Sequence, residues 1–340
     1  MKVGNQTIKL KNSPKIFETS SVVGPKEMQG PMAQHFDMHN DDVFFGEKTF
    51  EKAESKLMSD CINNLFTKTN MDPTRIDYIF AGDLLNQCMA SGFCIKDLNI
   101  PFFGLYGACS TFVESLILAS IFIDNNLANK TIAATSSHFC SSERQFRMPL
   151  EHGNQKSPTA QCTVTASGCA LVVPKDYSNT TGAYVTYVTP GKIVDMGISD
   201  PMNMGAAMAP AAFNTIITHL QDTGRKADYY DAIITGDLGV LGSEILIDLF
   251  NKEGIDISLI HKDCGKLIYD NESQDTHCGG SGCGCIASVF TGYFFKLLKD
   301  KKINKVLVVA TGALMSPQSS LQGESIPSIA HAISIENEVI

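Results

Sequence analysis

The sequence lacks the features that mark nucleic-acid-binding and membrane-spanning proteins. Its 340 residues carry 27 basic and 36 acidic side chains, for a net charge of −9, and no long run of Lys or Arg. The short basic stretch 299–302 is interrupted by Asp300. The longest uncharged apolar stretch, residues 283–295, falls short of the roughly 20 residues that a membrane-spanning helix needs. We therefore expect no nucleic-acid binding, and only peripheral membrane association through a partner.

Signs of a secreted or metal-binding protein are also lacking. The 11 cysteines are odd in number and scattered, which is typical of reduced intracellular thiols rather than of a disulfide framework. The N-terminal segment is polar and has no apolar core, so we expect no signal peptide. The cysteines after His277 are spaced among glycines, unlike a zinc site, and the pair His35 and His39 lies in a segment without an apolar stripe. We expect neither a metal nor a cofactor.

An internal repeat dominates what the sequence does contain. Residues 78–84 resemble residues 232–238, with Asp83 matching Asp237, and residues 129–135 resemble residues 304–310. Each half also holds a segment that is apolar on nearly every side, which predicts a helix buried on every side. Two such strand–helix–strand halves, 1–175 and 176–340, predict an α/β protein with sheets covered on both faces. The two apolar helices would lie between the sheets, giving a layered αβαβα body.

Periodicity and turn residues place the individual elements. The apolar spacing predicts one further helix, and short apolar runs predict strands. Residues 1–50 suggest one or two strands followed by an irregular excursion, and the residues after the strand near Ser136 suggest a loop. The expected helices are 49–67, 110–123 and 282–295, and the expected strands are 76–81, 100–106, 130–135, 170–173 and 304–310.

The turn that opens the first apolar helix carries a resemblance to a known family. Its sequence, Gly107-Ala108-Cys109-Ser110-Thr111, resembles that of the thiolase and ketoacyl-synthase superfamily. Together with segments 81–87, 104–111, 137–147, 153–161 and 279–285, it resembles the stage V sporulation protein AD family over residues 15–336. The resemblance implies a five-layered thiolase-like fold, a homodimer, and binding of dipicolinic acid. It also implies uptake of that acid into the developing spore, peripherally at the inner forespore membrane, with membrane proteins of the same system.

Cys109 is the central candidate residue. A thiol at a helix N-terminus has a lowered pKa, as in a nucleophile, although such a cysteine can also line a ligand site or simply pack. A condensing enzyme of the superfamily needs a His and an Asn, or a second His, from its second half. Residues 235–239 and 278–284, where these would lie, contain neither. We therefore expect a binding site that has kept the nucleophile position without catalysing a reaction.

The expected ligand carries two carboxylates and a flat ring, so its site needs fixed donors and an apolar wall. Four of the candidates also have an interpretation without a ligand. Arg144 and Arg147 could form ion pairs at the surface or at an interface, His138 could have a structural role, and Asp83 could cap the turn that follows it. Asp83 would orient a neighbouring donor, and the two glycines would let the backbone approach closely. The candidate ligand-binding residues are Asp83, Cys109, His138, Glu143, Arg144, Arg147, Gly280 and Gly282.

Two other functions remain open on the sequence. The first is an acyltransferase or condensing enzyme that uses a coenzyme A thioester through Cys109. The second is a structural subunit of a membrane transport complex that binds no small molecule. The methionine-rich stretch 196–208 resembles a loop that covers a site or packs at a dimer interface, because methionine adapts to irregular surfaces.

Overall fold

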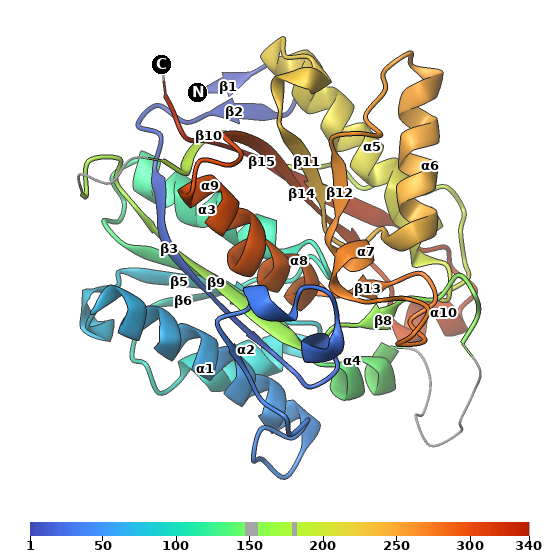
Figure 1. The fold of residues 1–340 in the computed structure, drawn as a ribbon, viewed down its shortest axis with the longest axis horizontal. Coiled ribbons are helices and arrows are strands. Elements are labelled where there is room, and N and C mark those ends of the chain that lie inside the picture. The colour runs from blue at the N-terminus through green and yellow to red at the C-terminus, as the bar shows by residue number, and fades with distance from the viewer. Residues whose placement is uncertain (147–155, 179–181, 340) are drawn as a thin grey trace.

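The computed structural model describes residues 1–146, 156–178 and 182–339. Its main sheet consists of two five-stranded halves that meet where Tyr184 pairs with Lys15 (Figure 1). The first half runs in the order β3 (Lys15–Val23), β9 (Ala166–Val173), β7 (Thr131–Ser137), β5 (Tyr78–Gly82), β6 (Phe102–Gly104). The second runs in the order β10 (Tyr184–Thr189), β15 (Ser328–Glu336), β14 (Lys305–Ala313), β11 (Ala232–Thr235), β12 (His261–Asp263).

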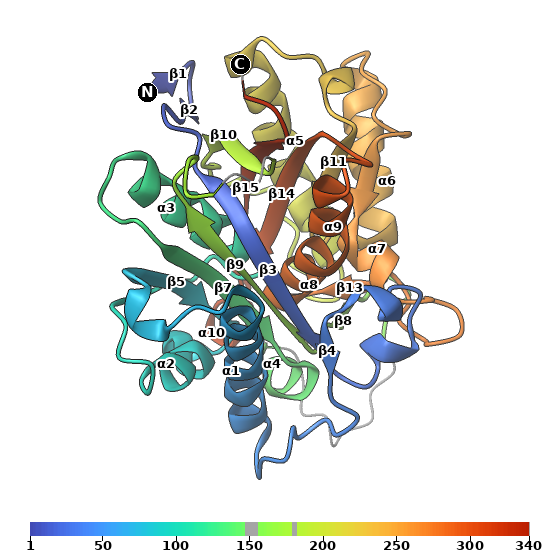
Figure 2. The same cartoon turned by 60° about the vertical axis from the view of Figure 1, so that its left-hand side comes forward.

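The helices complete a five-layered body, as the sequence predicts. Helices α1 (Phe50–Thr69) and α2 (Met89–Ile95) pack on the first half-sheet, on the side away from the second (Figure 2). Helices α5 (Met204–Thr223) and α6 (Gly239–Lys252) cover the outer face of the second. Between the sheets lie α3 (Thr111–Asp124) and a helix that passes from α8 (Cys283–Val289) through a π-helical turn into α9 (Phe295–Lys299).

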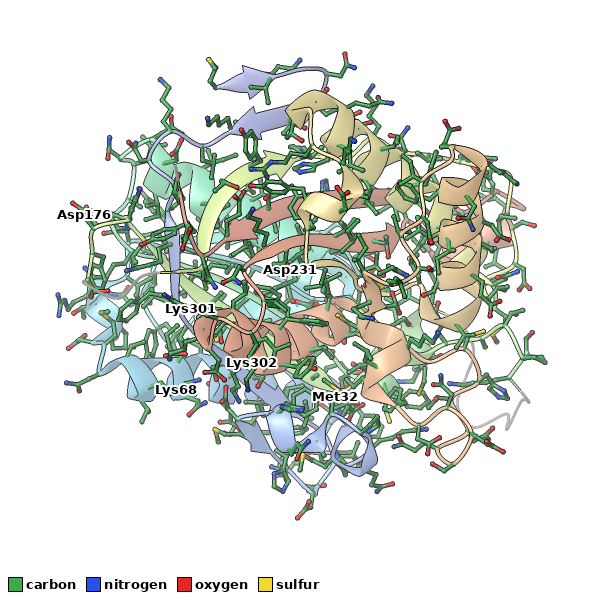
Figure 3. The ribbon with its side chains drawn as sticks, turned by 45° about the horizontal axis from the view of Figure 1, so that its top comes forward. Met32, Lys68, Asp176, Asp231, Lys301 and Lys302 are labelled. Atoms are coloured by element: carbon green, nitrogen blue, oxygen red, sulfur yellow. The ribbon has the colours of Figure 1, made fainter. Side chains whose placement is uncertain are left out.

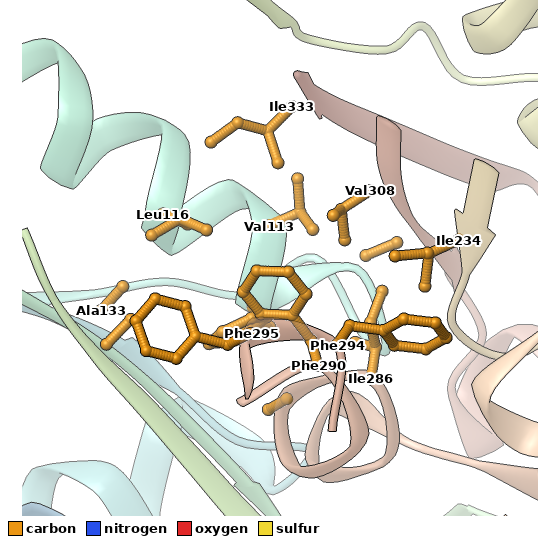
Figure 4. Close-up of a cluster of buried hydrophobic side chains, with 14 of the residues drawn as sticks. Val113, Leu116, Ala133, Ile234, Ile286, Phe290, Phe294, Phe295, Val308 and Ile333 are labelled. Atoms are coloured by element: carbon orange, nitrogen blue, oxygen red, sulfur yellow. The ribbon is translucent and has the colours of Figure 1, made fainter. Parts of the chain in front are cut away.

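The central layer is held together by apolar side chains from both sheets and both helices (Figure 4). Val113 and Leu116 of α3 face Phe290 and Phe294 of the opposite helix, and all of them are buried. Burying each phenylalanine contributes roughly 1.5–3 kcal/mol. The near absence of charge in residues 110–123 and 282–295, where Glu114 is the one charged side chain, is therefore a consequence of this double-sided packing.

Matching aspartates show the internal repeat in atomic detail. Asp77, just before β5, accepts hydrogen bonds from the amides of Asn129 and Lys130 at 2.6 and 2.9 Å. Asp231, just before β11, accepts the same bonds from the amides of Asn304 and Lys305 at 2.6 and 3.0 Å (Figure 3). Each aspartate thus fixes the start of the central strand beside it.

Most expected elements are present, with shifted ends. The strand expected at 100–106 is only three residues long, and the helix expected at 282–295 continues to Lys299. The division of the chain at residue 175 stays a prediction. No helix in the described ranges is long and apolar enough to cross a membrane. The short elements are β1 (Lys2–Val3), β2 (Thr7–Lys9), η1 (Glu27–Gln29), η2 (Ala33–His35), β4 (Met38–His39), η3 (Pro73–Arg75), η4 (Asn86–Cys88), α4 (Phe139–Phe146), β8 (Cys162–Thr163), η6 (Ala227–Tyr229), α7 (Cys264–Ile268), β13 (Gly280–Ser281), η7 (Phe290–Phe294) and α10 (Pro317–Leu321).

Candidate functional site

Cys109 lies on a tight turn directly before α3, as predicted. Ala108 has a φ of 51°, a conformation that is uncommon for a residue with a side chain. Hydroxyl groups hold this turn, because Ser110 Oγ donates to the Gly107 carbonyl at 2.6 Å and Thr111 Oγ1 donates to the Ala108 carbonyl at 2.6 Å. The thiol-bearing residue is only 6% exposed and faces a small pocket.

The end of β14 presses against the same turn. A Cβ on Gly312 would lie 2.2 Å from the Gly107 carbonyl oxygen and 3.1 Å from the Ser110 amide nitrogen, so only glycine fits there. This close approach brings Ala313 and Met315 of the second half beside Cys109. The site is therefore built at the junction of the two halves.

The pocket at Cys109 combines apolar walls with hydroxyl groups. Cys109 and Cys283, from the starts of the two buried helices, form a small apolar cluster at its base together with Leu84. The cavity volume is about 40 Å³, far below the roughly 300–1,000 Å³ of a pocket that holds a drug-sized ligand. The lining residues are Leu84, Tyr106, Ala108, Cys109, Ser142, Phe146, Thr163, Met204, Ser281, Ala313 and Met315.

Helix α4 forms one wall of the pocket, which corrects the loop expected after Ser136. Ser142 and Phe146 are one helical turn apart, so their side chains share a face, and both line the pocket. The Ser142 hydroxyl is buried and has no hydrogen-bond partner within the described part of the chain. An unpartnered buried hydroxyl at a pocket wall is a donor available to a ligand or a water molecule.

Buried carboxyl groups hold α4 in place. Ser141 and Ser136 donate to the two carboxyl oxygens of Glu54 on α1, at 2.7 and 3.2 Å. Burial, together with the nearby Asp83, raises the pKa of Glu54 to about 8. Two residues further along α4, the carboxyl group of Glu143 accepts a hydrogen bond from Thr163 Oγ1 at 2.9 Å. Glu143 therefore contacts a pocket-lining residue rather than lining the pocket itself.

Asp83 and His138 lie behind the pocket wall. Asp83 is buried and accepts hydrogen bonds from the amides of Leu85 and Ser91 and from the Ser91 hydroxyl at 2.6 Å, which fixes the segment that carries Leu84. His138 is buried, with Nε2 2.8 Å from the Val43 carbonyl, so this nitrogen carries the proton. Desolvation lowers the pKa of His138. Neither side chain is among the pocket-lining residues, and their ligand roles stay predictions.

The two predicted arginines are not gathered at Cys109. Arg144 projects from α4 to Glu51 of α1, with an Nη2–Oε1 distance of 2.7 Å, and it lies partly exposed over the Phe50 ring. An ion pair of this kind was the alternative to a ligand-binding role that the sequence left open for Arg144. Arg147 lies outside the described residues. Consequently, none of the described pocket-lining residues carries a positive charge.

The second half also contains two of the predicted glycines and the buried acid that matches Asp83 in the repeat. Gly282 has a φ of 112°, and a Cβ there would lie 2.7 Å from Ser137 Oγ, which confirms the need for glycine. Gly280 lets β13 pack against the Val164 and Ile268 side chains. Asp237 is fully buried, and burial raises its pKa well above the usual value, although the Gly282 amide favours the charged form. Burial thus favours the neutral form of Asp237, and residues 235–239 contain no histidine.

Sequence reasoning found the centre of the pocket but missed most of its wall. Of the eight candidates, Cys109 lines the pocket, while Asp83 and Glu143 each contact a segment that does. The missed residues Ser142 and Phe146 had a usable signal, their spacing of four, which becomes visible once residues 139–146 are read as a helix. Met204, at the start of α5, belongs to the methionine-rich stretch that was expected to form a loop covering a site or packing at a dimer interface.

Known proteins share both the sequence and the fold. The family described as "Stage V sporulation protein AD (SpoVAD)" matches residues 4–336. Stage V sporulation protein AD of Bacillus subtilis (strain 168) is 44% identical over 334 residues, which cover 98% of this chain and 97% of that protein.

Solved enzyme structures match over almost their whole length at low identity. The 3-oxoacyl-[acyl-carrier-protein] synthase III of Aquifex aeolicus VF5 matches with a TM-score of 0.56 and 11% identity, over 95% of this chain and 99% of the enzyme. An OleA variant of Xanthomonas campestris matches with a TM-score of 0.60 and 11% identity, over 96% and 100%. Another OleA structure, with bound lauric acid and lauroyl-CoA, matches with a TM-score of 0.60 and 10% identity, over 96% and 99%. The fold is thus thiolase-like, and the chain belongs to the stage V sporulation protein AD family.

Proposed function

We propose that this chain binds dipicolinate in the pocket at Cys109, and that it serves uptake of dipicolinate into the developing spore without catalysing a condensation. The observation that carries this proposal is the composition of the site. The cysteine turn opens into a pocket, while residues 235–239 and 278–284 of the second half contain neither the His nor the Asn of a condensing enzyme. A cysteine without such helpers cannot manage the protons of a condensation.

The pocket offers the chemistry that a flat dicarboxylate needs. Leu84, Phe146 and Met315 provide apolar surface for the ring, and the Ser142 and Tyr106 hydroxyls provide donors for a carboxylate. The positive end of the α3 dipole lies at the same point. Since the enclosed volume is only about 40 Å³, binding requires the wall formed by α4 to move outward. Arg144 is carried on that helix and would exchange Glu51 for a ligand carboxylate.

We also propose how the chain assembles with its partners. The chain would act as a homodimer, held at the inner forespore membrane by membrane proteins of the same system. Strand β6 lies at the end of the sheet order, beside the exposed side chains of Phe102, Phe103 and Tyr106 and of Phe93 on α2. Edge strands are available for pairing, and a two-fold axis allows the same patch to meet itself. A second copy of this chain is therefore the occupant that we propose for this edge.

Calorimetric titration with dipicolinate tests the function. We expect saturable binding that Ser142→Ala and Arg144→Gln weaken by about 5- to 30-fold, because each removes one donor worth about 1–2 kcal/mol. The matched control Ser55→Ala, on the outer helix α1, should bind like the unmodified protein. Absence of binding to the unmodified protein, or equal binding by the Ser142 and control variants, would overturn the proposed site.

Acyl transfer is the second candidate function. It is favoured by Cys109 at the N-terminus of α3, at a site with apolar walls, and by the OleA structure that contains lauroyl-CoA. Intact-mass measurement after incubation with acetyl-CoA and lauroyl-CoA distinguishes the two. A covalent acyl adduct that Cys109→Ala abolishes, followed by release of a product, would establish an enzyme. An unchanged mass, together with dipicolinate binding, supports the carrier.

A further inference from the structure

Two buried thiols meet in the core of the first half, away from the pocket. Cys61 on α1 and Cys169 on β9 have their sulfur atoms 3.4 Å apart, and neither side chain is exposed. The backbone fixes both positions. Cys61 Sγ lies 3.3 Å from the Ser20 carbonyl oxygen of β3, and Cys169 Sγ lies 3.4 Å from the carbonyl oxygen of Cys61. The two sulfurs are therefore held in van der Waals contact by three elements.

We propose that Cys61 and Cys169 are an oxidisable pair, which a peroxide converts into a disulfide that links α1 to β9. Bond formation requires the sulfur atoms to approach by about 1.4 Å, to the usual S–S distance of about 2.05 Å. The reaction consumes one hydrogen peroxide. The first thiolate attacks a peroxide oxygen and becomes a sulfenic acid, and the hydroxide that leaves takes up the proton that the thiol had lost, giving one water. The second thiol then attacks the sulfenic sulfur, forming the disulfide, and the other oxygen leaves as a second water.

The surroundings set the rate of this reaction. Burial raises the pKa of the Cys169 thiol well above its usual value, so little thiolate is present at neutral pH. We therefore expect slow oxidation at pH 7 and faster oxidation at pH 9. Hydrogen peroxide is small enough to reach buried sulfur during local opening, whereas a bulky disulfide reagent is not.

The disulfide would also restrain the helix that supports the candidate site. Helix α1 also carries Glu54 and Glu51, whose contacts with Ser141 and Arg144 hold α4. Fixing α1 to the central strand β9 would join residues far apart in the chain, and closing a loop of that length restricts the unfolded state strongly. Oxidation should therefore raise Tm by about 5–10 °C, and a reductant should reverse the rise.

Peptide mapping of the peroxide-treated, full-length protein tests the proposal. The expected result is a Cys61–Cys169 cross-linked peptide, two hydrogen atoms lighter than the sum of the two reduced peptides, and a Tm rise that dithiothreitol reverses. Cys169→Ala should abolish both the cross-link and the Tm rise. The control Cys264→Ala, another fully buried cysteine, should keep both.

Peptide mapping detects the cross-link in the unmodified protein, so its outcome does not depend on whether the variants fold. If Cys61 and Cys169 remain reduced after complete oxidation of the half-buried thiols of Cys88 and Cys140, the pair is not oxidisable and the proposal falls. It falls equally if Cys61 is linked instead to Cys94, which packs in the same core.

Discussion

The buried residue Glu54 makes the free energy of unfolding depend on pH. Its carboxyl group is fully buried, and its pKa rises from the ordinary value of 4.5 to about 8. Between these values the folded state binds one proton more than the unfolded state, so the free energy of unfolding falls as the pH rises through this window. We expect Glu54→Gln to keep the contacts with Ser136 and Ser141 while removing this dependence.

Denaturant titrations at pH 5 and pH 8 measure the effect. The unmodified protein should lose on the order of 1–3 kcal/mol more than Glu54→Gln over this interval. Asp60→Asn is the matched control, because Asp60 pairs with Lys56 at the surface of α1 and should shift both values without changing their difference. A Glu54→Gln variant with the original pH dependence would mean that Glu54 is ionised in the folded protein.

Individual residues were also where prediction from sequence was weakest. Cys109 could be found because a helix-opening turn is a local pattern. The Glu54 contacts could not, since α1 meets Ser136 and Ser141 only after folding brings together residues more than 80 positions apart. Arg144 carries the charge that a carboxylate ligand needs, but the sequence does not show that Glu51 lies within reach of it.

At the scale of the elements, the contact between β14 and the turn that carries Cys109 leaves the least space for a change in sequence. Gly312→Ala would place a Cβ 2.2 Å from the Gly107 carbonyl oxygen, so the strand end and the turn must separate. We expect a loss of about 1–3 kcal/mol in stability, as for other overpacked sites. Faster alkylation of Cys109 should accompany it as the pocket opens, which denaturant titration and mass spectrometry of the alkylated protein can measure.

Gly92→Ala provides the control for this substitution. Gly92 lies in α2, and nothing stands within 4 Å of the position its Cβ would take, so alanine should be neutral or should stabilise by up to about 1 kcal/mol. Equal stability and equal alkylation of the two variants would show that the strand end is not held against the turn.

The elements themselves were largely predictable from the sequence, and the exceptions have a physical reason. The helices at α1 and α3 and the strand β5 lie close to their expected positions, because their apolar spacing is governed by packing on a sheet. Helix α4 was mistaken for a loop because residues 139–146 have few apolar side chains. Its stability comes from Glu54 and Thr163, which are tertiary partners that a local pattern does not reveal.

At the scale of the whole molecule, the internal repeat allowed the layered fold to be predicted from the sequence. The unpaired edge of the sheet, in turn, indicates how two copies of the chain would associate. Strand β6 pairs with β5 on one side, and no described residue pairs with its other side. An exposed edge flanked by aromatic side chains is a liability in a monomer. We therefore expect a dimer with twice the 36.8 kDa mass of the chain, measurable by light scattering after size exclusion.

Substitutions at this edge should separate the dimer. Phe93→Asp and Phe102→Asp each place a charge on the exposed surface next to its own symmetry-related copy, so repulsion and desolvation both oppose pairing. Each variant should elute as a folded monomer with an unchanged circular dichroism spectrum. Leu321→Asp, on the exposed helix α10, should leave the dimer intact. If the unmodified protein is monomeric, or if both edge variants stay dimeric, β6 is not the interface, and its aromatic side chains must serve contacts with another protein.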